Sequence, residues 1–379
     1  MSHDPYAEGV NDLVCLDLPL GSAMVERISR AWDNGDAVFP LDQRLPAPER
    51  RRVLAAARPT VIHDGSGDSR LDGLPVETGD AVVVATSGTT GMPKAVVLTH
   101  DAVRASAVAT SARLGVTGDD TWFACLPPAH VGGLSVVLRS LVLGTPLITA
   151  PQFSVESYED AASRGATLVS LVATALRQVD ASMYRSIVLG GARPPADRPD
   201  NCVVTYGLTE TGSGVVYDGI PLDGVETDIR GGVIHLRAPM LLRAYRDGSV
   251  PLDAGGWFRT GDIGTFVDGR LTVHGREGDL IITGGENVWP EQVEDALRQH
   301  PSVLDVCVAG VPDAHWGQSV TAWVVPTPGS TVVLDELREF TKQTLPAFCA
   351  PKTVHTVQEI PRTALGKPRR AELASSTTD

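Results

Sequence analysis

The segment Thr86–Lys94 has the residue types of a phosphate-binding loop. It reads Thr-Ser-Gly-Thr-Thr-Gly-Met-Pro-Lys and follows an apolar, strand-like run at Ala81–Ala85. Glycines let backbone approach an anion closely, exposed N–H groups attract negative charge, and a lysine adds a point charge. Two residues rather than four separate the glycines, so this is not a Walker loop. An ordinary turn is the alternative. The predicted phosphate contacts are Thr86, Ser87, Gly88, Thr89, Thr90, Gly91 and Lys94.

Two further motifs also follow apolar runs. Glycines at the carboxyl end of a strand let a flat ring lie against the backbone, and such strand ends are where open α/β sheets bind ligands. The first motif is Gly190-Gly191-Ala192. The second is Tyr206-Gly207-Leu208-Thr209-Glu210, in which the tyrosine could stack on a base, the threonine could bind phosphate and the glutamate could hold Mg²⁺. Taken singly, the first could be a strand-exit turn and Glu210 a solvated acid.

A carboxylate and an arginine later in the chain could bind a sugar. Asp262 directly follows a glycine, and together with Arg276 it could hold the two hydroxyls of a ribose. A turn aspartate is the alternative. Between Gly275 and Pro290, Gly278 has the freedom of a hinge. An apolar triad and a Gly284-Gly285-Glu-Asn run follow, which a plain linker seldom carries.

A lysine near the C-terminus, Lys367, lies in the run Pro-Arg-Thr-Ala-Leu-Gly-Lys that begins at Pro361. A lone lysine in such a loop is usually only surface charge. Because Lys367 follows all the other motifs, it could instead be a functional residue. That interpretation depends on the motifs taken together.

Composition and charge restrict the class of protein. The formal net charge is −14 over 379 residues, which argues against a general binder of nucleic acid or membrane surfaces. Five scattered cysteines indicate reduced thiols, not a disulfide framework or a zinc site. The N-terminus lacks a signal-peptide pattern, and no run approaches the ~18 apolar residues of a membrane helix. We expect a soluble, cytoplasmic protein whose oligomeric state the sequence does not indicate.

The order of apolar runs predicts an α/β protein. Strand-length runs alternate with helix-length segments up to about residue 225, which favours parallel, doubly covered sheets. Residues 1–80 read as short helix-like segments and loops, with a helix at 46–57. Alternating runs at 233–237, 257–260 and 270–273 predict a small antiparallel unit. Further helices are expected at 101–114, 290–299 and 334–345, and strands at 121–126, 147–149, 167–172, 186–189, 202–205, 303–310 and 319–325.

Taken together, the motifs resemble the adenylate-forming superfamily, which includes acyl- and aryl-CoA ligases, luciferases and the adenylation domains of peptide synthetases. The resemblance covers about residues 80–370, in the family's order. It implies a large N-terminal domain, 1–276, of parallel or mixed sheets with helices and a small β unit. A small, mobile α+β domain, 277–379, would carry the lysine.

The resemblance also implies roles for single residues. The Thr86–Lys94 loop would hold the β- and γ-phosphates of ATP. The motifs at Gly190–Ala192 and Tyr206–Glu210 would flank adenine and the α-phosphate, with Thr209 and Glu210 in the catalytic set and Glu210 on Mg²⁺. Asp262 and Arg276 would bind ribose. Lys367 would contact both the attacking carboxylate and the α-phosphate, which relieves like-charge repulsion. After rotation about Gly278, the Gly284–Asn287 loop would help to form the CoA tunnel.

Three departures from the family pattern are visible. Ala95 stands where the family usually has glycine, and Thr283 stands where many members have lysine. The region before the phosphate loop is also short. None of these departures changes Glu210, Asp262, Arg276 or Lys367.

The segment Pro127–Arg139 corresponds to the family's acyl pocket. Its candidate substrate contacts are His130, Gly132, Gly133, Ser135 and Arg139. The histidine would line or gate the pocket and the glycines would leave room for a ring; a helix start with glycines for packing is the alternative. The segment has no aspartate to anchor an α-amino group, which disfavours a peptide-synthetase function.

This segment, the Gly-Gly-Glu-Asn run and the compact length are most similar to the o-succinylbenzoate–CoA ligases of menaquinone biosynthesis. The resemblance implies ATP-dependent activation of an aromatic dicarboxylate to an acyl adenylate, followed by transfer to CoA. Arg139 is the candidate for the second carboxylate, although the sequence does not fix its helix face. Another aryl- or acyl-CoA ligase, or a nucleotide-binding protein without ligase activity, remains the alternative.

Overall fold

The computed structural model describes residues 11–86, 93–191, 198–362 and 368–376. The chain divides into two compact units, one formed by 1–226 with 236–258 and the other by 227–235 with 259–379. The expected domain boundary at 276/277 stays a prediction. We describe each unit by itself.

The first sheet of the first unit has the strand order β16-β6-β5-β2-β1-β3-β4. The pairs β1–β2, β1–β3 and β2–β5 are parallel, whereas β5–β6, β6–β16 and β3–β4 are antiparallel. Its strands are β1 Leu13–Leu16, β2 Ala37–Pro40, β3 Val61–His63, β4 Asp68–Arg70, β5 Asp80–Thr86, β6 Lys94–Thr99 and β16 Ala244–Tyr245.

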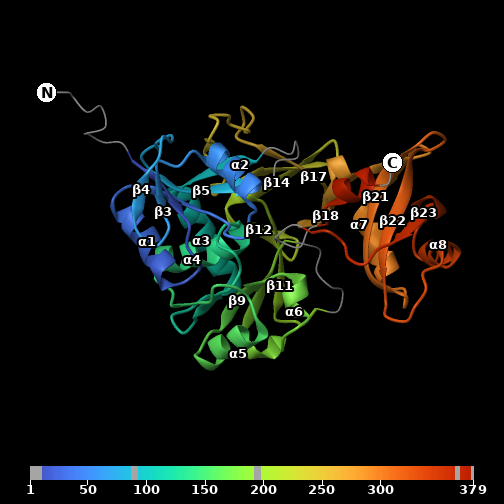
Figure 1. Ribbon diagram of the computed structural model, residues 1–379, viewed down its shortest axis with the longest axis horizontal. Helices are drawn as coiled ribbons and strands as arrows, with labels where there is room; N and C mark the ends of the chain where they lie inside the picture. Colours follow the sequence, from blue (N-terminus) through green and yellow to red (C-terminus); the bar gives the residue numbers. More distant parts are fainter. Residues whose placement is uncertain (1–10, 87–92, 192–197, 363–367, 377–379) are drawn as a thin grey trace. The chain divides into compact units, whose positions relative to one another are not determined.

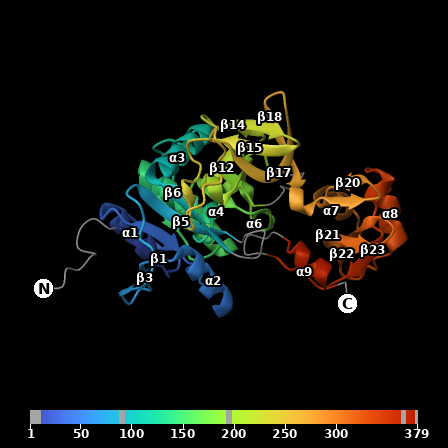
Figure 2. The ribbon, with the colours of Figure 1, turned by 90° about the horizontal axis from the view of Figure 1, so that it is seen from above.

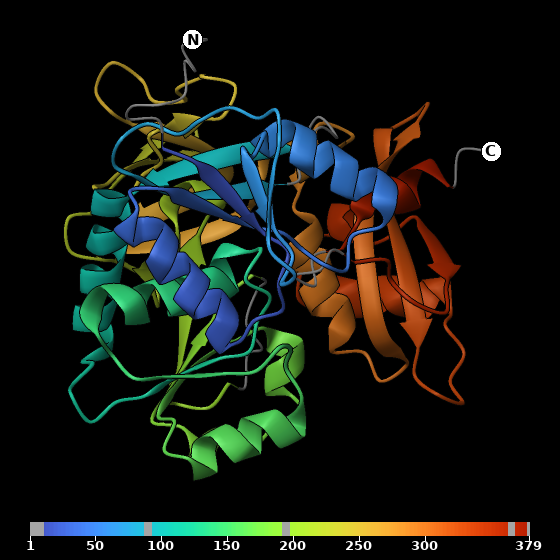
Figure 3. The same cartoon turned by 60° about the vertical axis from the view of Figure 1, so that its left-hand side comes forward.

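The first 80 residues therefore differ from the sequence-based expectation, because they contribute four strands as well as helices. The runs at β1 and β2 are only four residues long and buried throughout. Periodicity does not separate so short a buried run from part of a buried helix. The helix expected at 46–57 is confirmed as α2 Ala47–Ala57, and α1 is Ser22–Asp33. Ala57 of α2 packs into the same apolar cluster as β1 and β2, and Figure 3 shows α2 beside these strands.

The second sheet of this unit has the order β13-β12-β11-β10-β9-β7-β8, with a parallel centre and antiparallel β11–β12 and β12–β13 pairs. Helices α5 and α6 cover it, as the cluster around Tyr158, Val169 and Ile187 shows (Figure 1). The elements are β7 Trp122–Ala124, β8 Leu147–Thr149, α5 Val155–Ser163, β9 Leu168–Leu171, α6 Ala173–Leu176, η1 Ala181–Met183, β10 Ser186–Leu189, β11 Cys202–Gly207, η2 Thr209–Thr211, β12 Gly214–Tyr217 and β13 Ile220–Pro221.

Helices α3 His100–Leu114 and α4 Val131–Leu143 pack against each other in the first unit. Thr99 caps α3, its hydroxyl accepting from the Ala102 amide at 3.2 Å, and Gly115 ends it in the left-handed region at φ 58°. Helix α4 is apolar over most of its surface and is buried from Gly133 to Ser140. The helix expected at 101–114 is thereby confirmed.

The second unit begins with a four-stranded sheet of order β14-β15-β17-β18 (Figure 2). The expected antiparallel character is confirmed for the long β17–β18 hairpin. The strands are β14 Glu226–Arg230, β15 Val233–Arg237, β17 Phe258–Val267 and β18 Arg270–Arg276, and η3 Glu277–Asp279 follows.

The rest of the second unit is a sheet of order β20-β19-β22-β21, with β23 also on β22. Its two faces alternate along β21: Val306 and Val308 pack under α7 and α8, whereas Cys307 and Ala309 pack under α9. The elements are β19 Ile281–Thr283, β20 Glu286–Val288, α7 Pro290–Arg298, β21 Val303–Asp313, β22 Gly317–Pro326, α8 Leu334–Lys342, η4 Ala347–Cys349, β23 Thr353–Thr356 and α9 Arg370–Ser375.

All five cysteines are buried and unpaired by disulfides. Burial raises the pKa of the Cys15, Cys125 and Cys307 thiols to about 12. Among the described helices, none combines the length and the apolar character that crossing a membrane would require.

Candidate active site

The phosphate-loop motif connects β5 to β6. The two strands pair so that Thr86 lies opposite Lys94, at the end of the hairpin that the loop connects. Ser87, Gly88, Thr89, Thr90 and Gly91 lie outside the described residues. Lys94 is exposed, and its Nζ lies 4.7 Å from the centroid of the Tyr245 ring.

The Tyr-Gly-x-Thr-Glu motif forms the end of β11 and the short helix η2. Gly207 is required there, because an added Cβ would lie 2.2 Å from the Ser213 carbonyl oxygen. The turn is fixed by Thr211, which is fully buried. Its hydroxyl lies 2.8 and 2.7 Å from the carbonyl oxygens of Leu208 and Ser213, either of which can accept its one proton, and it accepts from the Leu208 amide at 2.9 Å. This packing sets the position of Glu210.

Tyr245 connects these two motifs, although it belongs to neither. Its hydroxyl donates to Oε1 of Glu210 at 2.9 Å, while Lys94 lies over its ring. The backbone of Tyr245 pairs with Val96 in the β6–β16 ladder. The sequence patterns do not mark this residue, because the contact joins segments 35 positions apart.

A single carboxylate at this place suits Mg²⁺ that arrives with a nucleotide. Mg²⁺ is commonly held by one or two carboxylates together with substrate phosphates, not by a cage of protein ligands. Within the described ranges, no group of three His, Cys, Asp or Glu side chains could hold a metal. Glu210, oriented by a phenol and next to a strand end, fits that kind of site.

The Gly-Gly-Ala motif lies at the end of β10, beside β11. The Thr205 hydroxyl donates to the Leu189 carbonyl oxygen at 3.0 Å, and it would lie 3.3 Å from a Cβ at Gly190. Gly191 has φ 85°, which favours glycine. Because β10 and β11 are parallel neighbours, Gly190 and the Tyr206 motif lie at the same edge of the sheet. Ala192 is outside the described residues.

The acyl-pocket segment consists of the residues before α4 and the first part of that helix. Gly133 has a packing reason, because an added Cβ would lie 2.4 Å from the Leu126 carbonyl oxygen. A Cβ on Gly132 would meet nothing within 4 Å, so the room expected for a substrate ring stays a prediction at that position.

His130, the residue before α4, has an acidic partner that the sequence did not indicate. Its Nε2 lies 3.5 Å from Oδ2 of Asp42. Burial would raise the pKa of Asp42, but the hydrogen-bonded Arg44, with His130 close by, holds that pKa well below its usual range. The Arg44 guanidinium binds both carboxylate oxygens, at 2.8 and 2.7 Å.

Arg139 is a buried cation in the wall of a pocket. The residue is 2% exposed, and burial lowers its pKa. Its Nη2 donates to the Ser213 hydroxyl at 3.3 Å, and its guanidinium carbon lies 4.8 Å from the Trp122 ring centroid. Among the described residues, its Nε and Nη1 have no hydrogen-bond partner. A buried cation in this state is suited to an anion supplied from outside the protein.

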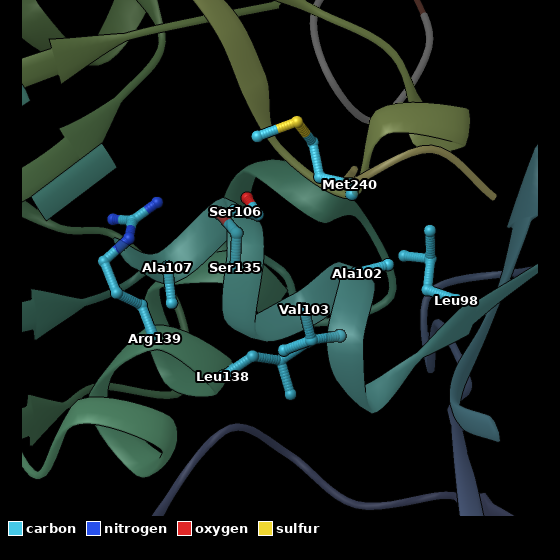
Figure 4. A pocket seen from close by; sticks show the side chains of 10 residues that line it. Leu98, Ala102, Val103, Ser106, Ala107, Ser135, Leu138, Arg139 and Met240 are labelled. Atoms are coloured by element: carbon cyan, nitrogen blue, oxygen red, sulfur yellow. The ribbon is translucent and has the colours of Figure 1, made fainter. Parts of the chain in front are cut away.

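The pocket beside Arg139 is formed mainly by α3 and α4, with Met240 across from them (Figure 4). The cavity is small, about 10 Å³, which is room for about one water molecule, and its walls are mostly apolar, with the hydroxyls of Ser106 and Ser135 among them. The lining residues are Leu98, Ala102, Val103, Ser106, Ala107, Ser135, Leu138, Arg139, Gly212 and Met240. Two predicted substrate residues, Ser135 and Arg139, are therefore brought together, whereas His130, Gly132 and Gly133 are not among its lining residues.

The predicted ribose pair lies in the second unit. Asp262 and Arg276 are register partners in the β17–β18 hairpin, with Arg276 Nε 3.1 Å from Asp262 Oδ1. The Thr260 hydroxyl accepts from the Asp262 amide at 3.0 Å and donates to the Ile234 carbonyl oxygen at 2.9 Å. The carboxylate and guanidinium are thus held side by side, as the sequence predicted.

The predicted CoA loop is the β19–β20 turn. Gly284 and Gly285 have φ of 61° and 84°, and a Cβ on Gly284 would lie 2.8 Å from the Trp316 ring. Lys352 lies over the same ring, 4.4 Å from its centroid, and donates to Oγ1 of Thr283 at 2.8 Å. A cationic group is therefore present at Thr283, where many family members have lysine. Lys367 lies outside the described residues.

Comparison with known families and proteins agrees with these motifs. The AMP-binding enzyme family matches residues 73–238, and the AMP-binding enzyme C-terminal domain matches residues 292–367. A probable 2-succinylbenzoate–CoA ligase of Mycobacterium tuberculosis is 36% identical over 369 residues, which cover 87% of this chain and 94% of that protein.

Two solved structures of the Bacillus subtilis o-succinylbenzoate CoA synthetase are also similar. The complex with the acyl-adenylate intermediate has a TM-score of 0.85 and 27% identity, covering 96% of this chain and 88% of that one. The complex with ATP and magnesium ion has a TM-score of 0.84 and 27% identity, covering 97% and 90%.

Proposed function

The chain belongs to the AMP-binding, adenylate-forming enzymes, and on that premise we propose that it is a 2-succinylbenzoate–CoA ligase. In the first half-reaction, an oxygen of the aliphatic carboxylate attacks the α-phosphorus of ATP and pyrophosphate leaves. In the second, the CoA sulfur attacks the acyl carbon, its proton is lost, and AMP leaves. The relatives that carry this name and the complex of one of them with the acyl adenylate support the proposal.

The observation that carries the choice of acid is Arg139. The substrate has two carboxylates, and only the aliphatic one reacts. The other needs a cation that the protein has not already neutralised. Arg139 supplies such a cation beside a mostly apolar pocket, since its guanidinium is buried and two of its nitrogen atoms have no hydrogen-bond partner among the described residues. A planar carboxylate could bind in a bidentate geometry to one of these two nitrogen atoms together with Nη2, which would add geometric selectivity.

The nucleotide would be bound by the motifs in their family roles. Thr86 and Lys94, with the loop between them, would contact the β- and γ-phosphates. Gly190, Gly191 and Tyr206 would flank adenine, and Thr209 would approach the α-phosphate. Asp262 would accept hydrogen bonds from the ribose hydroxyls, with Arg276 holding its carboxylate. Mg²⁺ bound by Glu210 would supply charge neutralisation for the pyrophosphate.

Lys367 would supply the positive charge of the first half-reaction only. The carboxylate and the α-phosphate are both negative as they meet, and an ammonium touching both lowers the barrier to their approach. We expect Lys367→Ala to slow adenylation by ~10²-fold or more. Thioesterification of a supplied acyl adenylate should stay near the wild-type rate, as measured by stopped-flow release of AMP. Equal loss of both half-reactions would contradict this role.

Transfer to CoA would use the other face of the C-terminal domain. Rotation about Gly278 would withdraw Lys367 and bring the Gly284–Asn287 loop to the pantetheine arm. An additional side chain on Gly284 would meet the Trp316 ring, so the loop has no room for one. CoA as co-substrate and the rotation are inferences from family membership.

A panel of carboxylic acids tests the proposed specificity. The measurement is pyrophosphate release with ATP, Mg²⁺ and CoA, and kcat/KM should be highest for 2-succinylbenzoate. Higher kcat/KM values for benzoates or fatty acids would identify another aryl- or acyl-CoA ligase. Lack of acid- and CoA-dependent AMP formation would instead indicate a nucleotide-binding protein without ligase activity.

A further inference from the structure

Tyr245 has a position that the family motifs do not explain. The residue is 7% exposed and lies on the short strand β16, paired with Val96 of β6. Its hydroxyl reaches the Glu210 carboxylate at 2.9 Å, and its ring faces the ammonium of Lys94. One side chain therefore contacts both the predicted metal ligand and the predicted phosphate lysine.

The neighbours of Tyr245 along the chain hold it firmly. Arg243 binds Asp80 with Nε at 2.8 Å and Nη2 at 3.0 Å, and that carboxylate is fully buried. Arg246 is buried and donates to backbone carbonyl oxygens, including those of Ala57 and Pro75 at 3.0 Å each. With both of these side chains anchored, the phenol has little freedom to move away from Glu210.

Each of the two contacts has a physical consequence. A phenol that donates to a carboxylate fixes the orientation of that carboxylate, and such outer contacts tune metal affinity by about 10–100-fold. An ammonium over an aromatic ring is held by the ring quadrupole, which restricts where the lysine can point. Both effects lower the cost of ordering the two charged groups when a nucleotide binds.

We propose that Tyr245 is a positioning residue that orients Glu210 for Mg²⁺ and Lys94 for the nucleotide phosphates. It does not touch substrate and acts through these two side chains. The proposal rests on the nucleotide half of the proposed function and is independent of which acid is activated.

Two substitutions of Tyr245 separate its two contacts, and a third substitution serves as the control. Tyr245→Phe removes only the hydroxyl, and Tyr245→Leu also removes the ring under Lys94. Tyr184→Phe is the matched control, because it removes another hydroxyl, one that donates to the Tyr158 carbonyl oxygen at 3.0 Å in the second sheet. Mn²⁺ replaces Mg²⁺ as the probe, and its affinity is measured by electron paramagnetic resonance with a non-hydrolysable ATP analogue bound.

We expect Tyr245→Phe to weaken Mn²⁺ binding about tenfold and Tyr184→Phe to leave it unchanged. Tyr245→Leu should also raise the dissociation constant of the ATP analogue without metal by about twofold to fivefold. In a Glu210→Gln background, Tyr245→Phe should have no further effect on Mn²⁺ affinity. If Tyr245→Phe instead caused a general structural defect, it would weaken Mn²⁺ binding further in that background.

An unchanged Mn²⁺ affinity in Tyr245→Phe would overturn the proposal, as would an equal loss in the Glu210→Gln background. Neither result would affect the ligase assignment if the wild-type protein forms AMP from an acid. Conversely, a wild-type protein that activates no acid would fail the proposed function, while the Mn²⁺ measurements would still decide the role of Tyr245.

Discussion

Two arginines, Arg139 in the first unit and Arg370 in the second, differ in what surrounds their charge. Arg139 contacts a tryptophan ring and one serine hydroxyl, and two of its nitrogen atoms have no described partner. Arg370 in α9 lies among carboxylates, with Nη2 2.9 Å from Glu294 and 3.1 Å from Glu291. Its Nη1 is 3.8 Å from Asp279.

The difference separates an arginine suited to binding from one suited to holding the fold together. A buried charge without a counter-charge is costly to the folded state, so it persists where a ligand supplies the missing charge. A buried charge among opposite charges needs no ligand. The contacts of the two guanidinium groups distinguish these residues more clearly than their burial does.

The largest effect is expected from removing the Arg139 cation. Arg139→Met should lower kcat/KM for 2-succinylbenzoate by about 10²–10³-fold, because the second carboxylate is then buried without a partner. Thermal unfolding should occur at the same or a higher temperature, since an uncompensated charge has left the interior. Arg139→Lys keeps the charge but not the planar guanidinium, so its kcat/KM should lie between those of the wild type and Arg139→Met. If Arg139→Met lost stability but kept its kcat/KM, Arg139 would serve the fold and not substrate binding.

Removal of the Arg370 cation should have the opposite pattern. Arg370→Met removes this counter-charge from the buried Glu294 and the half-buried Glu291, which should destabilise the second unit by about 3 kcal/mol in urea unfolding. Adding Glu294→Gln to this variant should restore part of the loss. An unchanged midpoint would show that these contacts contribute nothing to the fold.

The smallest effect concerns pH. Burial and neighbouring carboxylates raise the pKa of Glu291 despite Arg370, since several acids share few cations there. Because the pKa of Glu291 is higher in the folded state, its protonated form stabilises the fold. This contribution is complete below the pKa of the unfolded chain and is lost as pH rises through the folded-state pKa. Glu291→Gln, which resembles the protonated form, should therefore be less sensitive to raising the pH from about 4.5, the ordinary value, to 8. Thermal unfolding across that range measures it, and a steeper loss in the variant than in the wild type would disprove it.

The sequence predicted the site features that lie within one local segment or hairpin. It missed the contacts between side chains that are distant along the chain. Asp262 and Arg276 were predicted as a pair, and hairpin register places them opposite each other. Arg139 was identified, but its surroundings were not, because α4 is apolar over most of its surface and hides which face is buried. Tyr245 and Asp42 have partners 35 and 88 positions away, and no local pattern signals such contacts.

The buried cysteines bear on the chemistry of an enzyme that would make an electrophile. An acyl adenylate reacts with thiolates, and thiolate is the form in which a thiol is a nucleophile. Cys15, Cys125 and Cys307, with pKa values raised to about 12, stay protonated near neutral pH, and all five cysteines are shielded from solvent. In the proposed reaction, buried and protonated thiols of this kind would compete poorly with the thiol of CoA for the acyl adenylate.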